Sequence, residues 1–411
     1  MDIFSFLQPQ QQKNELISLA SSIPSNYVGG KRRILASIWD ILHDNNIEFN
    51  SVFDAFSGSS MVSLLFKLMG KTVICNDLLT SSTLTAFCLL HNHEEFPVDD
   101  EEIKYLLYNK PSNHTDFVLN NYCNKFFTEK ECIFLDSYKE NIIQLYGTQY
   151  YSGQNSSGNP KWNYFANTQS FNEKREYFKA SLALFAMLNH INQNCFLGGR
   201  YYNGQTIAKM KHRINHAKNN GKEITDIPLK MGKFQPIIER IQKEKDNCQV
   251  NKIFNCDVIE LLEKQTICAD LIYLDPPYGG ASSDYAMLYG FLEEYLYEDK
   301  LKNLDHIIKG SKRFSSNKGY QEQLEHLLGL CNNFKTWMIS YNESSYADLE
   351  TIINTIKSAG RDNVIVKSIP IAYQYRKNKN VVDEEQFVLN YYEEGYKFKE
   401  RGTEYLILAQ K

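Results

Sequence analysis

The feature that most constrains the fold is an apolar run that ends in two prolines. Leu271-Ile272-Tyr273-Leu274 is typical of a buried parallel strand, and Asp275-Pro276-Pro277-Tyr278 follows it directly. Because neither proline has an amide hydrogen, the strand cannot continue, and the chain must leave the sheet at the strand's carboxyl end. Ligands bind at that edge in open α/β sheets, so the tetrapeptide is predicted to lie in a binding site.

The tetrapeptide offers hydrogen-bond acceptors next to a flat ring. The Asp275 carboxylate and the backbone carbonyls beside the two prolines can accept, and the Tyr278 ring provides a stacking face. This set suits the exocyclic amine of a planar base. Alone, the four residues also fit a strand followed by a plain turn with a surface tyrosine, because short motifs carry a false-positive risk.

Strand and helix patterns alternate at both ends of the chain. The first part predicts helices over 31–43 and 61–69, with Gly70 as a cap, and strands over 51–56 and 72–75. Further strands are predicted over 252–256, 271–275, 335–340, 364–371 and 405–409. This alternation predicts an α/β fold with a mostly parallel, doubly wound sheet.

A helical, loop-rich region separates the two sets of strands. It begins at the acidic stretch 94–102, which predicts a linker or the start of a different module, and extends to about residue 234. We therefore expect a sheet domain formed by residues 1–95 and 236–411, interrupted by an insertion over 96–235.

A loop of small residues lies between the first predicted strand and its helix. The segment Asp54-Ala55-Phe56-Ser57-Gly58-Ser59 lets the backbone approach a ligand beside the helix amides. Asp77 ends the next strand about twenty residues after Gly58, where an acidic side chain binds ribose hydroxyls in dinucleotide folds. With a single glycine, the loop also fits a tight turn without a ligand.

Two further segments are candidates for the same site. Tyr27-Val28-Gly29-Gly30-Lys31 precedes the first helix; its paired glycines allow close backbone approach, and Lys31 supplies a cation for a carboxylate. By itself this segment better fits a flexible turn with a solvated lysine. Asp257 follows the strand over 252–256 and fits a ligand contact, a helix N-cap, or both.

Positive charge is concentrated in one stretch of a slightly acidic chain. The net charge is −4, so no global field draws the protein to nucleic acid. Between Gly198 and Phe234, basic residues outnumber acidic ones, which favours phosphate and base contacts but also fits a solvated helix face. The candidate DNA-binding residues are Arg200, Tyr202, Asn203, Lys209, Lys211 and Arg213. A smaller basic run, 309–313, predicts a loop that is either near DNA or solvated.

Composition argues against several classes of protein. Nine cysteines without a Cys-x-x-Cys pair indicate reduced thiols rather than a disulfide framework or a zinc site, and no metal is expected. The start of the sequence does not resemble a signal peptide, and no run is long enough to span a membrane. A soluble, cytoplasmic protein is expected.

Together these segments resemble the Dam-like, D12-class adenine-specific DNA methyltransferases, which depend on S-adenosylmethionine. The matching segments are 27–31, 54–58, 194–203, 275–278, 340–344, 375–376 and 404–407. Their order is similar to the alpha-type arrangement of the family, and residues 97–170 have no evident counterpart. Ala55 and Ser59 depart from the family, in which a proline and a second glycine are common at these positions.

The resemblance implies a Rossmann-like methyltransferase sheet, with an antiparallel strand near the C-terminus and an inserted, mainly helical DNA-recognition region. It places Asp275, Pro276, Pro277 and Tyr278 in the catalytic motif. It places Tyr27 and Lys31 at the methionine end of the cofactor, Asp77 at its ribose, Asp257 at its adenine, and Asp275 between methyl donor and target base. The full implied cofactor set is Tyr27, Gly29, Gly30, Lys31, Asp54, Phe56, Gly58, Asp77, Asp257 and Asp275.

The implied function is methylation of the 6-amino group of a flipped-out adenine in double-stranded DNA. The resemblance further implies a bacterial or phage modification enzyme, with a cognate restriction endonuclease as a candidate functional partner. Two alternatives stay open: the same fold acting on cytosine, RNA adenine or a glutamine amide, and a DNA-binding protein whose catalytic site has decayed. Asp275 favours adenine, because serine or asparagine at that position would favour cytosine or glutamine in related families.

Overall fold

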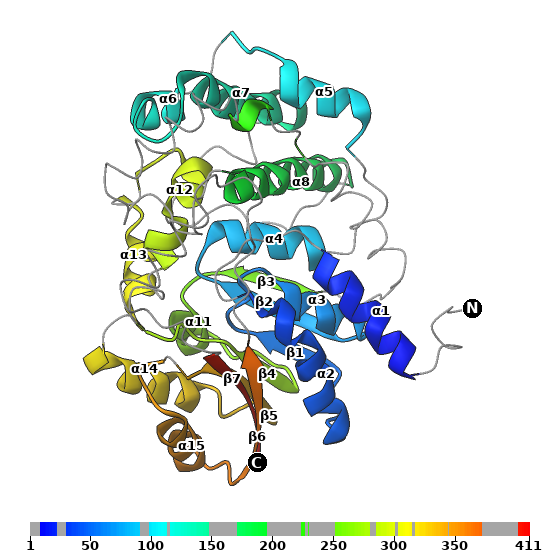
Figure 1. Cartoon of the computed structure of the whole chain (residues 1–411), viewed down its shortest axis with the longest axis vertical. Helices are drawn as coiled ribbons and strands as arrows, with labels where there is room; N and C mark the ends of the chain where they lie inside the picture. Colours follow the sequence, from blue (N-terminus) through cyan, green and yellow to red (C-terminus); the bar gives the residue numbers. More distant parts are fainter. Residues whose placement is uncertain are drawn as a thin grey trace, which may run out of the picture.

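The structure is a computed structural model in which helices cover both faces of one sheet (Figure 1). It describes residues 9–22, 30–90, 98–112, 116–147, 171–194, 223–226, 229, 251–279, 285–300, 303–314, 317–343, 345–371 and 402–411.

The sheet has seven strands in the order β3-β2-β1-β4-β5-β7-β6. Their bounds are β1 Ser51–Asp54, β2 Thr72–Asp77, β3 Lys252–Asn255, β4 Leu271–Leu274, β5 Thr336–Asn342, β6 Asn363–Ile371 and β7 Gly402–Gln410. Strand β7 is antiparallel to its neighbours β5 and β6, whereas the other pairings are parallel. The predicted fold class, a mostly parallel sheet with an antiparallel strand near the C-terminus, is confirmed.

Alternate residues of the strands serve two separate cores. Val52, Val73 and Leu271 face one core, and their neighbours Phe53 and Ile74 face the other, as the two-residue period of a strand requires. The first core is covered by α1 Pro9–Ser22, α2 Leu35–Asp44, α3 Met61–Leu68 and α4 Thr80–Leu90, and the second by α11 Val258–Lys264, α14 Asn317–Leu330 and α15 Leu349–Ser358. Burial on both faces explains why the strands are apolar throughout.

The first predicted helix differs from the structure at its beginning. Residues Lys31–Ile34 form a 3-10 turn, η2, and α2 starts only at Leu35 because Ile34 has a non-helical backbone (φ −110°, ψ 3°). The predicted cap of α3 is present. Gly70 follows the helix with φ +80°, and its amide donates to the Lys67 carbonyl at 2.9 Å.

A second group of helices lies beyond α4 (Figure 1). It contains α5 Asp100–Tyr108, α6 Phe117–Tyr122, α7 Glu129–Tyr146, α8 Phe171–Asn194 and the short turn η6 Ile224–Asp226. The acidic stretch around residue 100 begins a helix, since Asp99 and Glu102 form a reciprocal capping box at the start of α5.

The helical group is joined to the sheet domain by buried polar contacts. Lys139 of α7 donates to the Tyr295 and Leu296 carbonyls, at 2.8 and 2.9 Å, at the end of α12 Tyr285–Tyr297. Helix α12 in turn places Glu293 at the start of α4, where its carboxylate accepts from the Thr80 and Ser81 amides. These contacts link α12 to both groups of helices.

The basic run 309–313 was expected to be a loop, and this expectation is wrong. It forms the end of α13 Asp305–Lys312 and the residue after it. Leu304, Ile307 and Ser311 are buried at helical spacing and hold this helix against the sheet domain. All cysteines in the described ranges are free thiols. None of the helices in those ranges is long and apolar enough to cross a bilayer.

Candidate active site

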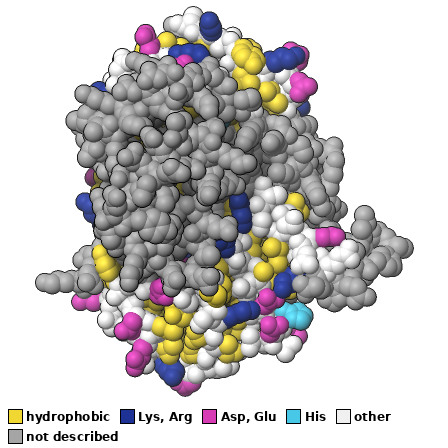
Figure 2. Space-filling model, in the orientation of Figure 1, with side chains coloured by type: hydrophobic (Ala, Val, Ile, Leu, Met, Phe, Trp, Pro, Cys, Tyr) yellow, Lys and Arg dark blue, Asp and Glu magenta, His cyan; other side chains and the backbone are white. Residues whose placement is uncertain are grey.

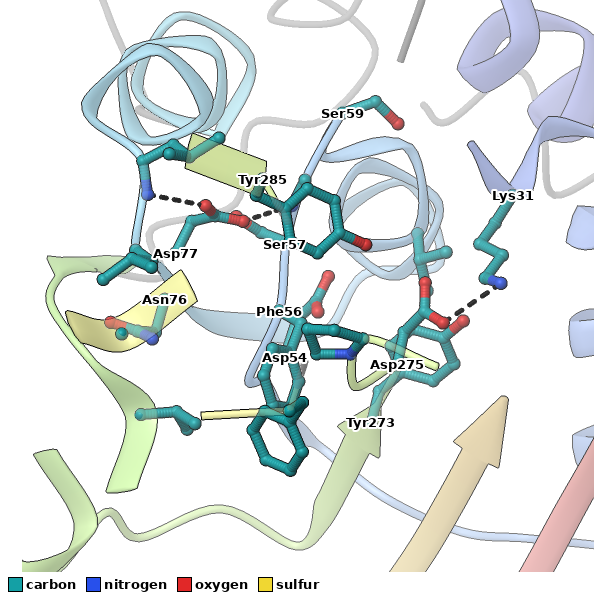
Figure 3. A pocket seen from close by; sticks show the side chains of 18 of the residues that line it. Lys31, Asp54, Phe56, Ser57, Ser59, Asn76, Asp77, Tyr273, Asp275 and Tyr285 are labelled. Atoms are coloured by element: carbon teal, nitrogen blue, oxygen red, sulfur yellow. Dashed lines mark hydrogen bonds and ion pairs between the residues drawn. The ribbon is translucent and has the colours of Figure 1, made fainter. Parts of the chain in front are cut away.

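The loops that follow β1 to β4 line one pocket at the carboxyl edge of the sheet. The pocket encloses about 900 Å³, part of it open to solvent. The strand order changes direction at this point: β2 and β3 lie on one side of β1, and β4 lies on its other side. This reversal of strand order is where open α/β sheets bind ligands. Figure 3 shows Asp77 on one side of the pocket, the Lys31–Asp275 pair on the other, and Asp54 and Phe56 between them.

The loop after β1 is held by backbone hydrogen bonds to the neighbouring strands. The Ala55 amide donates to the Tyr273 carbonyl at 3.1 Å, and the Ser57 amide donates to the Asn76 carbonyl at 2.9 Å. A proline at position 55 could not make the first bond. Ala55 therefore extends the β1–β4 pairing by one residue at the point where the chain enters the pocket.

Asp77 connects the loop to the end of β2. Its carboxylate accepts from the Gly58 amide at 2.7 Å and from the Leu79 amide at 2.8 Å. Burial raises the pKa of Asp77 to about 6, although both amide hydrogen bonds oppose this shift. Asp77 thus fixes the loop and lines the pocket at the same time.

Asp54 is an almost fully buried carboxyl at the centre of the pocket. The Ser63 hydroxyl donates to its Oδ2 at 2.6 Å, whereas Oδ1 meets no donor with hydrogen-bonding geometry among the described residues. The Ser57 hydroxyl also lines the pocket, where it lies beside the buried Cys75 thiol. Burial raises the pKa of Asp54 to about 7. Buried polar atoms of this kind in a pocket indicate a missing polar partner.

Asp257 caps α11, which confirms the N-cap interpretation, and its side chain also lines the pocket. Its Oδ1 accepts from the Ile259 amide at 3.0 Å, and its Oδ2 pairs with Arg313 Nε at 2.5 Å. The apolar wall beside it is formed by Phe56, Leu78, Val258 and Phe314. A Cβ on Gly310 would lie 2.6 Å from a Leu78 methyl group and 3.2 Å from the Asp257 carboxylate, so glycine favours the close contact of α13 with this wall.

Asp275 lies at the end of β4 in a buried cluster with a lysine, a tyrosine and a second carboxylate. Lys31 Nζ is 3.0 Å from Asp275 Oδ1, and the Tyr278 hydroxyl donates to the same oxygen at 2.5 Å. Lys31 also pairs with Glu404 of β7 and lies 4.9 Å from the centre of the Tyr278 ring. The Tyr278 ring therefore stands beside the carboxylate, fixed by its own hydroxyl.

Burial and the ion pairs shift the pKa values of this cluster in different directions. Burial raises the pKa of Asp275 although Lys31 opposes the shift. The pKa of Lys31 is also raised, because the Asp275 and Glu404 carboxylates outweigh the effect of burial. For Glu404 burial alone would raise the pKa, but Lys31 and the hydrogen bonds from Ser340 and Asn342 lower it.

The pocket brings together most of the predicted site residues that the structure describes. Gly30, Lys31, Asp54, Phe56, Gly58, Asp77, Asp257, Asp275, Pro277 and Tyr278 line it. Pro276 is buried between two of them. The predicted residues Tyr27, Gly29, Arg200, Tyr202, Asn203, Lys209, Lys211 and Arg213 lie outside the described residues.

Sequence reasoning missed several residues of the site. Tyr285, Ser311 and Phe314 line the pocket, and Glu404 and Arg313 pair with its charged groups. The helical spacing of Leu304, Ile307 and Ser311 could have revealed α13. Glu404 belongs to segment 404–407, which resembles the family, but the sequence assigned it no role, because it reaches the site only through the pairing of β7 with β5.

The described residues provide no candidate metal site. Among them, no group of three or more histidine, cysteine or acidic side chains is placed to hold a metal ion. On the coloured part of the face in Figure 2, acidic and basic side chains are interspersed.

Comparison with known proteins identifies the class of enzyme to which this fold and site belong. The family model described as "D12 class N6 adenine-specific DNA methyltransferase" matches residues 27–355. The chain belongs to this family, and the resemblance noted in the sequence is confirmed. It is a DNA adenine methyltransferase with a Rossmann-like sheet.

Three similar proteins with curated names are a type II methyltransferase and two modification methylases. The type II methyltransferase M2.HphI of Haemophilus parahaemolyticus is 24% identical over 355 residues, which are 86% of this chain and 93% of that protein. Modification methylase StsI of Streptococcus sanguinis is 25% identical over 86% of this chain, and modification methylase LlaI of Lactococcus lactis subsp. lactis is 24% identical over 82%. The aligned part is 49% of each of these two proteins, so the chain spans about half their length. No solved structure matches the chain.

Proposed function

We propose that this methyltransferase uses S-adenosylmethionine to methylate the 6-amino group of one adenine within a specific sequence of double-stranded DNA. We further propose that it acts as the modification enzyme of a restriction–modification system, as the names of its relatives suggest for those proteins. The observation that carries the proposal is the position of Asp275, which lies partly buried beside the Tyr278 ring in the same pocket as Asp54 and Asp77.

The residues of the pocket suit S-adenosylmethionine, which supplies a methyl group on a positively charged sulfur. Oδ1 of Asp54 would accept from the cofactor's ammonium, since this buried atom lacks a donor in the described part of the chain. Asp77 would bind the ribose hydroxyls. The apolar wall of Phe56, Leu78, Val258 and Phe314 would receive the adenine, and Asp257 at its edge would accept from the adenine's amine. The acidic lining suits a cationic ligand.

Asp275 and Tyr278 would hold the target base. Hydrogen bonds from the 6-amino group to Asp275 and to the Pro276 carbonyl would keep the amine pyramidal, with its lone pair directed at the methyl group. Positioning of this kind can contribute roughly 7–11 kcal/mol. The raised pKa of Asp275 also suits it to take up the proton that the amine releases on methylation.

The base must leave the duplex to reach this pocket. Flipping costs a few kcal/mol, and stacking on the Tyr278 ring would recover on the order of 1–3 kcal/mol. We propose that the inserted region over 96–235 contacts the DNA and that its basic stretch neutralises phosphates. This part of the proposal comes from the sequence, because the basic residues concerned lie outside the described ranges.

The proposal is tested by methyl transfer from labelled S-adenosylmethionine to mixed-sequence DNA, followed by digestion to nucleosides. We expect the label in N6-methyladenine. Label in 4-methylcytosine, or only in RNA or protein, would contradict the proposed acceptor. DNA binding without any transfer would instead favour a protein with a decayed catalytic site. Methylation mapping of DNA from cells that express the chain would give the recognition sequence.

A further inference from the structure

Glu404 reaches the active site because β7 runs against the other strands. Asn342, at the carboxyl end of β5, pairs with Glu404 near the start of β7. The first residues of an antiparallel strand lie at the edge where its parallel neighbours end. Glu404 is thereby placed at the carboxyl edge of the sheet, beside the end of β4. It lies beyond residues 27–355, the range matched by the family model.

The Glu404 carboxylate is buried and held on both oxygens. Oε1 accepts from the Ser340 hydroxyl at 2.8 Å, and Oε2 accepts from the Asn342 amide at 3.2 Å. Both donors belong to β5, so the strand pairing itself fixes the position of the carboxylate. Only 4% of the residue is exposed. A buried charge of this kind is strongly destabilising when it has no cationic partner.

The two donors that bind Asp275 also bind Glu404. Lys31 pairs with both carboxylates, and the Tyr278 hydroxyl lies 2.5 Å from Asp275 Oδ1 and 3.0 Å from Glu404 Oε1. The hydroxyl has one hydrogen, so it can donate to only one of the two carboxylates at a time. Lys31 has three, and its three neighbours are Asp275, Glu404 and the Tyr278 oxygen. Asp275 and Glu404 therefore share the Lys31 ammonium and compete for the single proton of the Tyr278 hydroxyl.

This competition bears on how Asp275 binds the target base. When Asp275 accepts from the 6-amino group of adenine, its oxygens must be released, at least partly, by Lys31 and Tyr278. Buried donors cannot be left without an acceptor, because an unpaired ammonium or hydroxyl in the interior is strongly destabilising. Glu404 is the acceptor that already contacts both.

We propose that Glu404 is a positioning residue for methyl transfer: it retains Lys31 and the Tyr278 hydroxyl when Asp275 takes up the amine of the target adenine. This inference rests on the proposed function. The shifts in pKa agree with it, because Glu404 is held ionised by its surroundings while the Asp275 carboxyl is made more basic. The anion of Glu404 is then the better partner for the Lys31 ammonium.

The test compares the full-length protein with its Glu404→Gln variant, which keeps the shape of the side chain and removes its charge. Without that charge Lys31 pairs with Asp275 alone. We expect kcat to fall on the order of a hundredfold, as for other losses of positioning, while the Kd of S-adenosylmethionine changes much less. The acid limb of the kcat profile should move to lower pH, because the Glu404 charge helps to raise the pKa of Asp275. A purely structural role would not move this limb.

Two further variants separate positioning from stability. Glu102→Gln removes a carboxylate from a distant ion pair with Lys179, and it should lower Tm without changing kcat or its pH profile. In a Lys31→Met background, Glu404→Gln should have a much smaller effect on kcat than in the wild type, because the two residues act as a unit. Equal effects in both backgrounds would show that Glu404 does not act through Lys31.

The outcomes for the inference and for the proposed function are distinct. If the wild type transfers no methyl group, the proposed function fails. If the wild type is active and Glu404→Gln has a normal kcat and pH profile, the inference alone is overturned. Should Glu404→Gln not fold, Ser340→Ala decides the matter, since it removes one donor that fixes the carboxylate. A lowered kcat at unchanged cofactor affinity then supports the inference, and a wild-type kcat refutes it.

Discussion

The Gly58 amide donates to the Asp77 carboxylate at 2.7 Å, which ties the loop after β1 to the end of β2. The Leu79 amide donates to the other oxygen of Asp77 at 2.8 Å. One carboxylate thus fixes two backbone segments that line the same pocket. The loop has a stable shape without a second glycine at position 59, because its geometry is set by Asp77 and by the backbone bonds of Ala55 and Ser57.

Replacing Asp77 should therefore weaken cofactor binding in two ways. Asp77→Asn keeps one acceptor and loses the other, so one of the two backbone amides loses its partner and the ribose loses an anionic acceptor. Because hydrogen bonds to charged groups contribute about 1.5–3 kcal/mol, we expect the Kd of S-adenosylmethionine to rise at least about tenfold. Isothermal titration calorimetry measures this directly. Unchanged affinity would exclude Asp77 from the cofactor site.

Asp54 predicts a pH dependence of cofactor binding. With a pKa of about 7, its carboxyl is mostly protonated below neutral pH in the free protein. A cationic ligand favours the ionised form, so the affinity should weaken by up to about tenfold per pH unit below pH 7. Asp77, with a pKa of about 6, adds to this loss at lower pH. Above pH 7 the affinity should level off until the cofactor's own ammonium loses its proton, at about 7.7–8.0.

The control for this pH dependence is Asp54→Asn, which should bind more weakly and lose the part of the slope nearest neutrality. Calorimetry in buffers of different ionisation enthalpy should show proton release on binding to the wild type. The same shift implies that the free energy of unfolding of the ligand-free protein falls as pH rises from about 4 towards 7, because the folded state holds the Asp54 proton more tightly. A flat binding profile would show that Asp54 does not contact a cation.

Gly279 should be required for the position of Tyr278. It has φ +93°, and a Cβ at this position would strike the ring of Tyr346, whose amide donates to the Tyr278 carbonyl at 3.0 Å. Gly279→Ala should cost about 1–3 kcal/mol from the backbone alone and lower kcat more than it changes the Kd of S-adenosylmethionine. Gly279→Ala with Tyr346→Ala should regain stability in part, because it removes the clash but not the strained φ. Wild-type kcat in the single variant would contradict this role.

The sequence predicts the sheet and the location of the site because these depend on local patterns. The apolar run before Asp275 predicts β4, and the prolines after it predict where β4 ends. The apolar runs over β1 and β2 likewise predict strands. Loops at the carboxyl ends of neighbouring parallel strands must meet. Asp54, Asp77 and Asp275 could therefore be assigned to one pocket without knowledge of their contacts.

Local patterns cannot show contacts that arise from strand order or from helix packing. Glu404 lies 126 residues after Tyr278, and the two meet only because β7 inserts between β5 and β6. Arg313 was assigned to a basic loop, whereas α13 brings it to Asp257. In both cases the charged side chain forms an ion pair that no local pattern predicts. The sequence also left the role of Asp257 open. An aspartate directly after a strand and before a helix can cap the helix, line a pocket, or do both.

Asp275 should be essential for transfer but not for DNA binding. Asp275→Ala removes the proposed acceptor of the 6-amino group, so methyl transfer should fall by more than about a hundredfold. DNA affinity, measured by fluorescence anisotropy, should stay largely intact because phosphate contacts dominate it. Near-normal turnover of this variant would show that the proposed mechanism is wrong.

The basic stretch between Gly198 and Phe234 predicts salt-dependent DNA binding. If Arg200, Lys209 and Lys211 each neutralise one phosphate, replacing all three with glutamine should weaken binding and reduce the slope of log K against log salt by about 0.9 per lost contact. Anisotropy titrations at several salt concentrations measure this slope. The control is Lys264→Gln, an exposed lysine of α11 that pairs with Glu260 and lies outside the inserted region. An unchanged slope in the triple variant would return the stretch to the alternative interpretation, a solvated helix face.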